Sequence, residues 1–286
     1  MNCDYLQKFL FENLQIKGSF VRLDRCWQEI LQRAHPDVTA QELLGEAVSA
    51  AALLTSNIKF QGSISLQVQS AGAMRFLLGQ CNHRGDVRGV VRMREQTAES
   101  FLEQAILSIN LEPEIEGSPY QGIVEMSDEG LVPVLERYFS QSEQLETRFW
   151  LGVGLDWCSG LMLQKMPGET FDADGWNRIT ILASSVLEKE LQCLDSGHLI
   201  KRLFHEEDVR LFPASEVRFR CSCSTQKVLS MLQTLGEDDL NELIQERGSV
   251  EVSCEYCGHT YQFDKVDVAR IFTDIGFLPP SSTGLH

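Results

Sequence analysis

Apolar side chains recur at helical spacing in several stretches of the N-terminal half of the chain. The clearest series begins at Thr39, which forms a capping box with Glu42 and so predicts the first turn of a helix. A shorter amphipathic pattern near the N-terminus has the same period. On these patterns the sequence predicts helices at residues 6–10, 39–54, 97–107 and 131–140.

Between these stretches apolar and polar residues alternate with a period of two, which is typical of half-buried strands. A Gln61-Gly62-Ser63 turn predicts a hairpin between the second and third of them. The predicted strands lie at residues 20–23, 58–60, 64–68, 74–78, 87–93, 121–126, 149–153 and 160–164. Short turns join most of them, so the predicted fold class is α+β with mostly antiparallel sheets.

The pattern becomes purely helical after Gly175 and changes again near Pro213. We therefore predict an N-terminal α+β domain at residues 1–174, a helical linker at 175–212 and a small C-terminal domain at 213–286. In that last part, two helices precede two short strands. The linker carries an apolar stripe that needs another surface to cover it, formed by Ile179, Leu182, Val186, Leu187, Leu191 and Leu194.

The nine cysteines fall into two groups. Five stand alone in the sequence, and we expect them to be packing residues: Cys3, Cys26, Cys81, Cys158 and Cys193. The other four form a Cys-x-Cys pair and, thirty residues later, a Cys-x-x-Cys pair: Cys221, Cys223, Cys254 and Cys257. Zinc prefers four soft ligands in a tetrahedron, and two close thiol pairs supply them. The sequence therefore predicts one Zn²⁺ site made of these four cysteines.

Two other interpretations of these cysteines are disfavoured. A thioredoxin-type motif would open a helix, whereas strand alternation follows Cys257. His259 is a rival ligand, but four cysteines already complete the coordination shell.

A disulfide between Cys221 and Cys223 would close a very small, strained and readily reduced ring. Spacing alone leaves open whether the site is an inert structural site or a redox switch.

Charge and composition narrow the possible functions. The chain has 25 basic against 41 acidic residues, giving a formal charge of −16, and the segment from Cys221 to Cys257 is itself acidic. Binding to nucleic acid is therefore not expected, because phosphate contacts need clustered basic residues. There is neither a signal-peptide pattern nor an apolar run long enough to span a bilayer, so we expect a cytoplasmic protein with no membrane partner.

Motifs of common enzyme classes do not appear in the sequence. It has no Gly-rich phosphate loop, no His-Glu-x-x-His and no Gly-x-Ser-x-Gly. Gly152-Val153-Gly154 fits a strand bend, and the acidic cluster at residues 205–208 fits a solvated end of the linker. We therefore expect a protein that is not an enzyme.

The order of Cys-x-Cys, helical spacer and Cys-x-x-Cys resembles the C-terminal switch of the 33 kDa chaperonin family of redox-regulated heat-shock chaperones. The resemblance runs from about residue 4 to about residue 271. Glu146 departs from the family pattern, which has proline there. Four further segments resemble the family in the same order, at residues 9–21, 117–124, 138–145 and 205–207.

The resemblance implies an ATP-independent holdase that is inactive when reduced and zinc-bound. On oxidation zinc leaves, Cys221 pairs with Cys223 and Cys254 with Cys257, the C-terminal domain and linker lose structure, and the protein dimerises and holds unfolding clients. The apolar stripe of the linker is then a candidate for client contact or for propagating the unfolding. The alternative is a constitutive zinc-ribbon binding or regulatory protein with an inert four-cysteine site.

Overall fold

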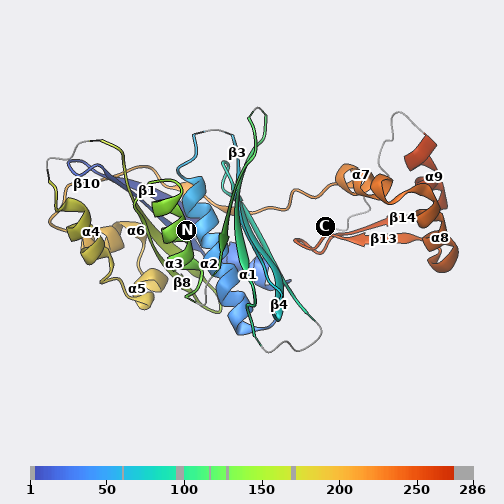
Figure 1. The fold of residues 1–286 in the computed structure, drawn as a ribbon, viewed down its shortest axis with the longest axis horizontal. Coiled ribbons are helices and arrows are strands. Elements are labelled where there is room, and N and C mark those ends of the chain that lie inside the picture. Colours follow the sequence, from blue (N-terminus) through green and yellow to red (C-terminus); the bar gives the residue numbers. More distant parts are fainter. Residues whose placement is uncertain are drawn as a thin grey trace. The chain divides into compact units, whose positions relative to one another are not determined.

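The computed structural model describes residues 4–59, 61–94, 100–115, 117–126, 129–168 and 172–273. The chain divides into two compact units, Met1–Arg220 and Cys221–His286. Each unit has its own hydrophobic core, and Figure 1 shows the elements of each. The three-part division expected from the sequence stays a prediction.

Six strands of the first unit form a sheet, called sheet A, in the order β10-β1-β2-β9-β8, with β11 also paired to β1. All of these pairs are antiparallel. The strands are β1 (Tyr5–Phe11), β2 (Ile16–Leu23), β8 (Thr147–Val153), β9 (Cys158–Lys165), β10 (Val209–Leu211) and β11 (Ser215–Glu216).

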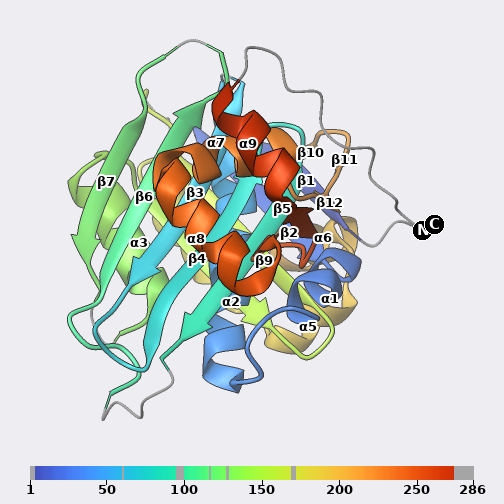
Figure 2. The same cartoon turned by 90° about the vertical axis from the view of Figure 1, so that its right-hand side faces the viewer.

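Six other strands of the first unit form sheet B, in the order β12-β5-β4-β3-β6-β7. Figure 2 shows β7, β6, β3, β4 and β5 side by side. The pairs are antiparallel except for β12, which is parallel to β5. The strands are β3 (Gly62–Gln69), β4 (Met74–Asn82), β5 (Asp86–Met93), β6 (Ile106–Pro113), β7 (Tyr120–Glu125) and β12 (Arg218–Phe219).

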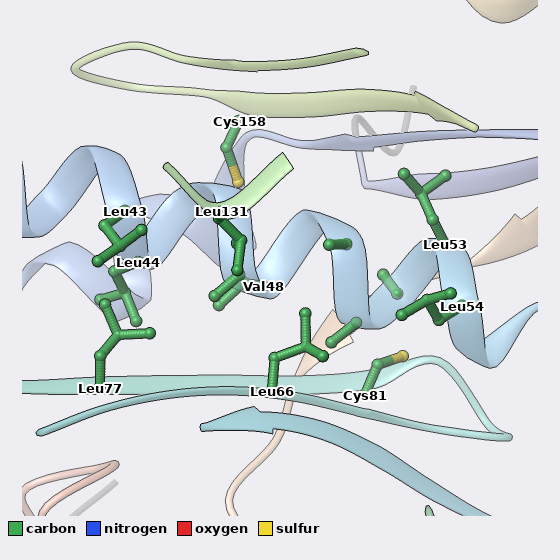
Figure 3. Close-up of a cluster of buried hydrophobic side chains, with 14 of the residues drawn as sticks. Leu43, Leu44, Val48, Leu53, Leu54, Leu66, Leu77, Cys81, Leu131 and Cys158 are labelled. Carbon is green, nitrogen blue, oxygen red and sulfur yellow. The ribbon is translucent and has the colours of Figure 1, made fainter. Parts of the chain in front are cut away.

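Helix α2 (Val38–Thr55) lies between the two sheets and is buried around most of its circumference. Figure 3 shows Cys158 of β9 on one side of the helix and Leu66 and Leu77 of sheet B on the other. The close approach to β4 requires a glycine, because a Cβ at Gly79 would lie 2.6 Å from the backbone of α2. The main core of the first unit is centred on this helix.

A second layer of helices covers the opposite face of sheet A. It consists of α4 (Gly175–Ala183), α5 (Glu188–Cys193) and α6 (Ser196–Leu203). Side chains alternate between the faces of a strand: Leu161 and Leu163 of β9 join the cluster under these helices, whereas Met162 joins the core around α2. The remaining helices are α1 (Arg25–Leu31), near β5 and β12, and α3 (Leu131–Gln141), which contacts β7 and β8.

The second unit is small and has one compact core. Its elements are α7 (Thr225–Leu235), α8 (Glu237–Arg247), β13 (Val250–Ser253), β14 (Thr260–Phe263) and α9 (Lys265–Thr273). The two strands form an antiparallel hairpin. The buried residues of this core are Val228, Leu229, Leu232, Leu240, Ile244, Val250, Phe263 and Val268.

The predicted α+β class with mostly antiparallel sheets is confirmed, as are the helices at residues 39–54 and 131–140. The helix predicted at residues 6–10 is wrong, because these residues lie in β1. Sheet A is covered on both faces, so apolar residues do not alternate strictly along β1 and mimic helical spacing.

Three further predictions need correction. Residues 58 and 59 do not form a hairpin with β3, since β3 pairs with β4 and β6; Phe60, the third residue of that predicted strand, lies outside the described residues. The predicted helix at 97–107 is wrong, because residues 100–105 are irregular and β6 begins at Ile106; residues 95–99 lie outside the described ones. The N-cap of α2 is Asp37, whose carboxylate accepts a hydrogen bond from the Ala40 N–H, so Thr39 is not the cap.

Candidate metal centre

The Cys-x-Cys pair lies in an extended stretch that leads into α7. Ser224, which follows Cys223 directly, caps this helix by accepting a hydrogen bond from the Lys227 N–H. The Lys227 ammonium also reaches back and donates to the Ser222 carbonyl at 2.8 Å. Cys221 and Cys223 are therefore held against the first turn of α7.

The Cys-x-x-Cys pair lies in the turn between β13 and β14. The Gly258 N–H donates to the Cys254 carbonyl and the Cys254 N–H donates to the His259 carbonyl, both at 2.8 Å. Gly258 has a φ of 69°, in the left-handed region that favours glycine. The glycine after Cys257 therefore allows the chain to turn tightly behind the two thiols.

The folded spacer brings the two pairs together. Cys221 Sγ lies 3.5 Å from Cys254 Sγ, and Cys223 Sγ lies 3.4 Å from Cys257 Sγ. All four sulfurs lie within 4.8 Å of one another. Four sulfurs arranged tetrahedrally at 2.3 Å from a zinc ion would be about 3.8 Å apart. The arrangement therefore fits a single metal ion with four thiolate ligands.

The environment favours a thiolate at one of the four positions. Burial opposes ionisation of Cys254, but hydrogen bonds from the backbone N–H groups of Cys257 and Tyr256 and from the neighbouring thiols together lower the pKa of Cys254 to about 7. Burial raises the pKa of Cys221, and together with the neighbouring thiols it raises the pKa of Cys257 to about 12. A negative charge in the cluster is therefore most stable on Cys254.

His259 does not belong to the cluster, and its ring contacts Tyr261 edge-on at a centroid distance of 4.6 Å. The solitary cysteines lie elsewhere. Burial raises the pKa values of Cys81 and Cys158 to about 12, which makes these two thiols poor nucleophiles. Cys26 is also buried and Cys193 is exposed, while Cys3 lies outside the described residues.

The six residues of the predicted linker stripe have different surroundings. Ile179 and Leu191 are fully buried against sheet A. Leu187, by contrast, is 61% exposed at the start of α5. The other three, which are half-buried and pack against the same cluster, are Leu182, Val186 and Leu194. All of the stripe except Leu187 therefore packs in the second hydrophobic cluster of the first unit.

The sequence analysis missed a second candidate site, a pocket beside Glu42 and Glu46 of α2. The signal was two glutamates one helical turn apart in a helix that is otherwise mostly apolar. Glu42 was interpreted as a capping residue instead.

Among the described residues, the helices are too short or too polar to cross a membrane.

The comparisons with known proteins decide the family. A family model described as Hsp33 protein matches residues 4–264. The chain belongs to the Hsp33 family. Among Hsp33 relatives, a 33 kDa chaperonin from Nitrosococcus oceani is 39% identical over 285 residues, which is 99% of both chains. The 33 kDa chaperonin of Azotobacter vinelandii is 38% identical and is matched over 98% of both chains.

A solved structure shows the same fold. The crystal structure of a 33 kDa chaperonin, a heat shock protein 33 homologue from Thermotoga maritima, superimposes with a TM-score of 0.81 at 21% identity. The match covers 94% of this chain and 97% of that one. The family resemblance seen in the sequence is therefore confirmed, and the chain is a homologue of heat-shock chaperones of the Hsp33 family.

Proposed function

We propose that the chain is a redox-regulated, ATP-independent holdase. In the reduced state Cys221, Cys223, Cys254 and Cys257 bind one Zn²⁺ and the protein is inactive. In the oxidised state it binds unfolding or oxidatively damaged proteins and prevents their aggregation. The observation that supports this most strongly is the cluster of four thiols within 4.8 Å in a chain of the Hsp33 family.

The second unit depends on its metal for stability. A structural zinc site contributes on the order of 10–16 kcal/mol of apparent binding free energy, whereas whole domains are stable by about 5–15 kcal/mol. The core of this unit, as far as the structure describes it, is a small cluster of apolar residues from α7, α8, α9 and the hairpin. Loss of the metal is therefore expected to unfold the unit.

Oxidation would remove the ligands of the metal. Two thiols and one molecule of peroxide give one disulfide and two molecules of water, so two peroxides oxidise all four cysteines. A disulfide sulfur is no longer a thiolate, and only the thiolate binds the metal well. Oxidation of either pair would therefore empty the site.

The proposed disulfides are Cys221–Cys223 and Cys254–Cys257. In the folded unit the shortest sulfur distances run crosswise, from Cys221 to Cys254 and from Cys223 to Cys257. Those contacts depend on the folded spacer. Once the unit unfolds, partners two or three residues apart meet more often than partners more than thirty apart, because loop-closure entropy rises with length. This supports pairing within each motif.

Unfolding of the second unit would then affect the layer formed by α4, α5 and α6. Apart from Leu187, the apolar stripe of that layer packs against sheet A, so its release would uncover both its own side chains and the sheet beneath. We propose that these surfaces hold client polypeptides, and that the oxidised chain forms a homodimer in the cytoplasm. Because this chain has a formal charge of −16, we propose that its clients are proteins and not nucleic acids.

The test is a parallel measurement of zinc, free thiols and holdase activity before and after peroxide at elevated temperature. Reduced protein should contain one zinc and leave a heat-denatured client to aggregate. Oxidised protein should contain no zinc, have lost four thiols, suppress light scattering without nucleotide and sediment as a dimer. Equal suppression by both forms would support the alternative, a constitutive binding protein with an inert zinc site.

A further inference from the structure

A pocket in the first unit, remote in sequence from the four cysteines, combines apolar walls with two carboxylates. Its volume is about 330 Å³, at the lower end of the range for ligand pockets. One wall is the N-terminal half of α2, which contributes Glu42 and Glu46. The residues of the apolar lining are Leu43, Phe101, Leu102 and Met126.

The two carboxylates have no cationic partner among the described residues. Glu42 and Glu46 are four residues apart, so both side chains lie on the same face of α2. No ion pair joins either carboxylate to a described basic residue, and the described residues that line the pocket include no Lys, Arg or His. Burial, followed by the charge of Glu42, raises the pKa of Glu46 to about 7.

The wall opposite α2 is held in place by backbone hydrogen bonds. The Met74 N–H donates to the Phe101 carbonyl at 3.1 Å, and the Glu103 N–H donates to the Ser70 hydroxyl at 2.9 Å. Leu43 and Met126 are each only 8% exposed. The apolar part of the pocket is therefore preformed, and beside it Glu46 is half-buried and Glu42 is exposed.

We propose that this pocket binds the side chain of a lysine from a bound polypeptide. The ammonium group would lie between Glu42 and Glu46, and the four-carbon stem would lie against the apolar lining. A lysine side chain has this same division between an apolar stem and a charged head. Partial removal of a carboxylate from water costs free energy when the carboxylate has no partner. A cation in the pocket would offset that cost.

The choice of a polypeptide as the source of the lysine rests on the proposed holdase function, whereas the preference for a cation rests on the pocket alone. The experiment uses full-length, reduced, zinc-loaded protein with ¹³C-labelled methionine methyl groups, so it does not depend on the redox switch. The Met126 methyl signal reports occupancy of the pocket. The probe is the peptide acetyl-Ala-Ala-Lys-Ala-Ala-amide, and its comparator has norleucine in place of lysine.

We expect the lysine peptide to shift the Met126 signal saturably and to bind about tenfold more tightly than the norleucine peptide, since a charge-assisted hydrogen bond supplies a difference of that order. The double variant Glu42→Gln/Glu46→Gln should lose this tenfold preference. Leu102→Ala should weaken both peptides alike, because it shortens the wall that both stems contact.

The matched control is Glu242→Gln/Glu246→Gln on α8, which removes two exposed glutamates with the same spacing and the same change in net charge. It should bind both peptides as the wild type does. Equal binding of the lysine and norleucine peptides would overturn the proposal. An equal loss in the two double variants would overturn it as well, because it would show attraction to the acidic chain as a whole.

Discussion

The two units of the chain reach their stability in different ways. In the first, helix α2 is enclosed between two six-stranded sheets, and a second helical layer covers the outer face of sheet A. In the second, three short helices and one hairpin share a single small cluster of apolar residues, with four thiols close together at one hairpin turn. Small domains bury a smaller fraction of their surface and often need a metal or disulfides.

Because of this difference, we expect the second unit to be more sensitive than the first to chemical change at a few side chains. Under the proposed function, a change at four sulfur atoms removes most of what stabilises that unit, whereas the described residues of the first unit contain no comparable group of metal ligands. The helical layer α4–α6 belongs by its packing to the stable unit, although its sequence pattern suggests a separate linker. A switch that exposes this layer must therefore disrupt its packing on sheet A.

The largest expected effect is the loss of the metal. Cys254→Ser removes one of four ligands, and a metal contribution of about 10–16 kcal/mol exceeds what a unit of this size can replace. We expect the variant to lose zinc and to lose amide protection across α7, α8 and the hairpin, while β1–β9 keep theirs. Hydrogen exchange with mass spectrometry measures both.

The matched control for that experiment is Cys193→Ser, which changes an exposed cysteine outside the cluster and should leave zinc content and exchange unchanged. Preserved protection of β13 and β14 in metal-free protein would contradict the prediction that this unit needs a metal to fold. It would mean that the small apolar core keeps the second unit folded by itself and that the four thiols contribute little to its stability.

A second prediction concerns the helical layer on sheet A. Leu191 is 3% exposed, so Leu191→Asp places a charge in an apolar core and should destabilise the reduced first unit by more than about 3 kcal/mol. Leu187 is 61% exposed, so Leu187→Asp should change stability by less than about 0.5 kcal/mol. Urea unfolding followed by tryptophan fluorescence measures the difference.

If release of this layer activates the protein, the reduced Leu191→Asp variant should also suppress client aggregation while still holding zinc. The reduced Leu187→Asp variant should not. A loosened layer with no gain in activity would separate the layer from the client surface and leave the second unit as the part that binds.

The cysteine site was predictable from sequence because its signal is local. Two pairs of cysteines at short spacing, with a glycine after the second, predict a turn and a cluster of thiols almost independently of the rest of the fold. The short segments that resemble the 33 kDa chaperonin family were local signals too, and they made the family predictable from the sequence. By contrast, β1 was predicted as a helix, because burial of Phe9 and Leu6 on opposite faces of sheet A cannot be read from a seven-residue window.

The burial of the linker stripe and the pocket beside Glu46 depend on residues distant in sequence. Ile179 and Leu187 look alike in the pattern, yet one is buried and the other exposed, because α4 ends at Ala183 and the helical period does not continue to Leu187, which precedes α5. The wall opposite Glu46 comes from residues 100–102 and 126, which no local period connects to α2. Tertiary packing decides such features.

A third prediction tests the packing of α2 on sheet B. A Cβ at Gly79 would lie 2.6 Å from the backbone of Ala47 and Val48, so Gly79→Ala must move the helix and should cost about 2–3 kcal/mol. At Gly89 the nearest atom is a methyl group of Val48 at 2.8 Å, which can rotate away. Gly89→Ala should therefore cost less.

Thermal and urea unfolding of the two alanine variants measure this difference, and zinc content should equal that of the wild type in both. If Gly89→Ala were as unstable as Gly79→Ala, the Val48 side chain could not move to make room, and the prediction would be wrong. Loss of zinc in either would show that the two units are energetically coupled in the reduced state.

The smallest expected effect is the pH dependence caused by Glu46. Burial and Glu42 raise its pKa from the ordinary 4.5 to about 7 in the folded chain. Between these values the folded state holds a proton that the unfolded state has lost, so this group makes stability fall as pH rises from about 4.5 to 7. Above that range the full penalty remains, roughly 1–2 kcal/mol after allowance for partial exposure. Glu46→Gln should remove it.

The measurement is the difference in unfolding free energy between Glu46→Gln and the wild type, taken from pH 5 to pH 8. It should grow with pH in favour of the variant and level off above pH 7. Because the difference is taken at each pH, titration of the cysteine site cancels. Glu246→Gln on α8 is the control and should give a flat line near zero, since that side chain is exposed in the folded unit. A flat line for Glu46→Gln as well would mean that its carboxylate is already solvated or paired, and the pocket would then have no unsatisfied charge to offer a ligand.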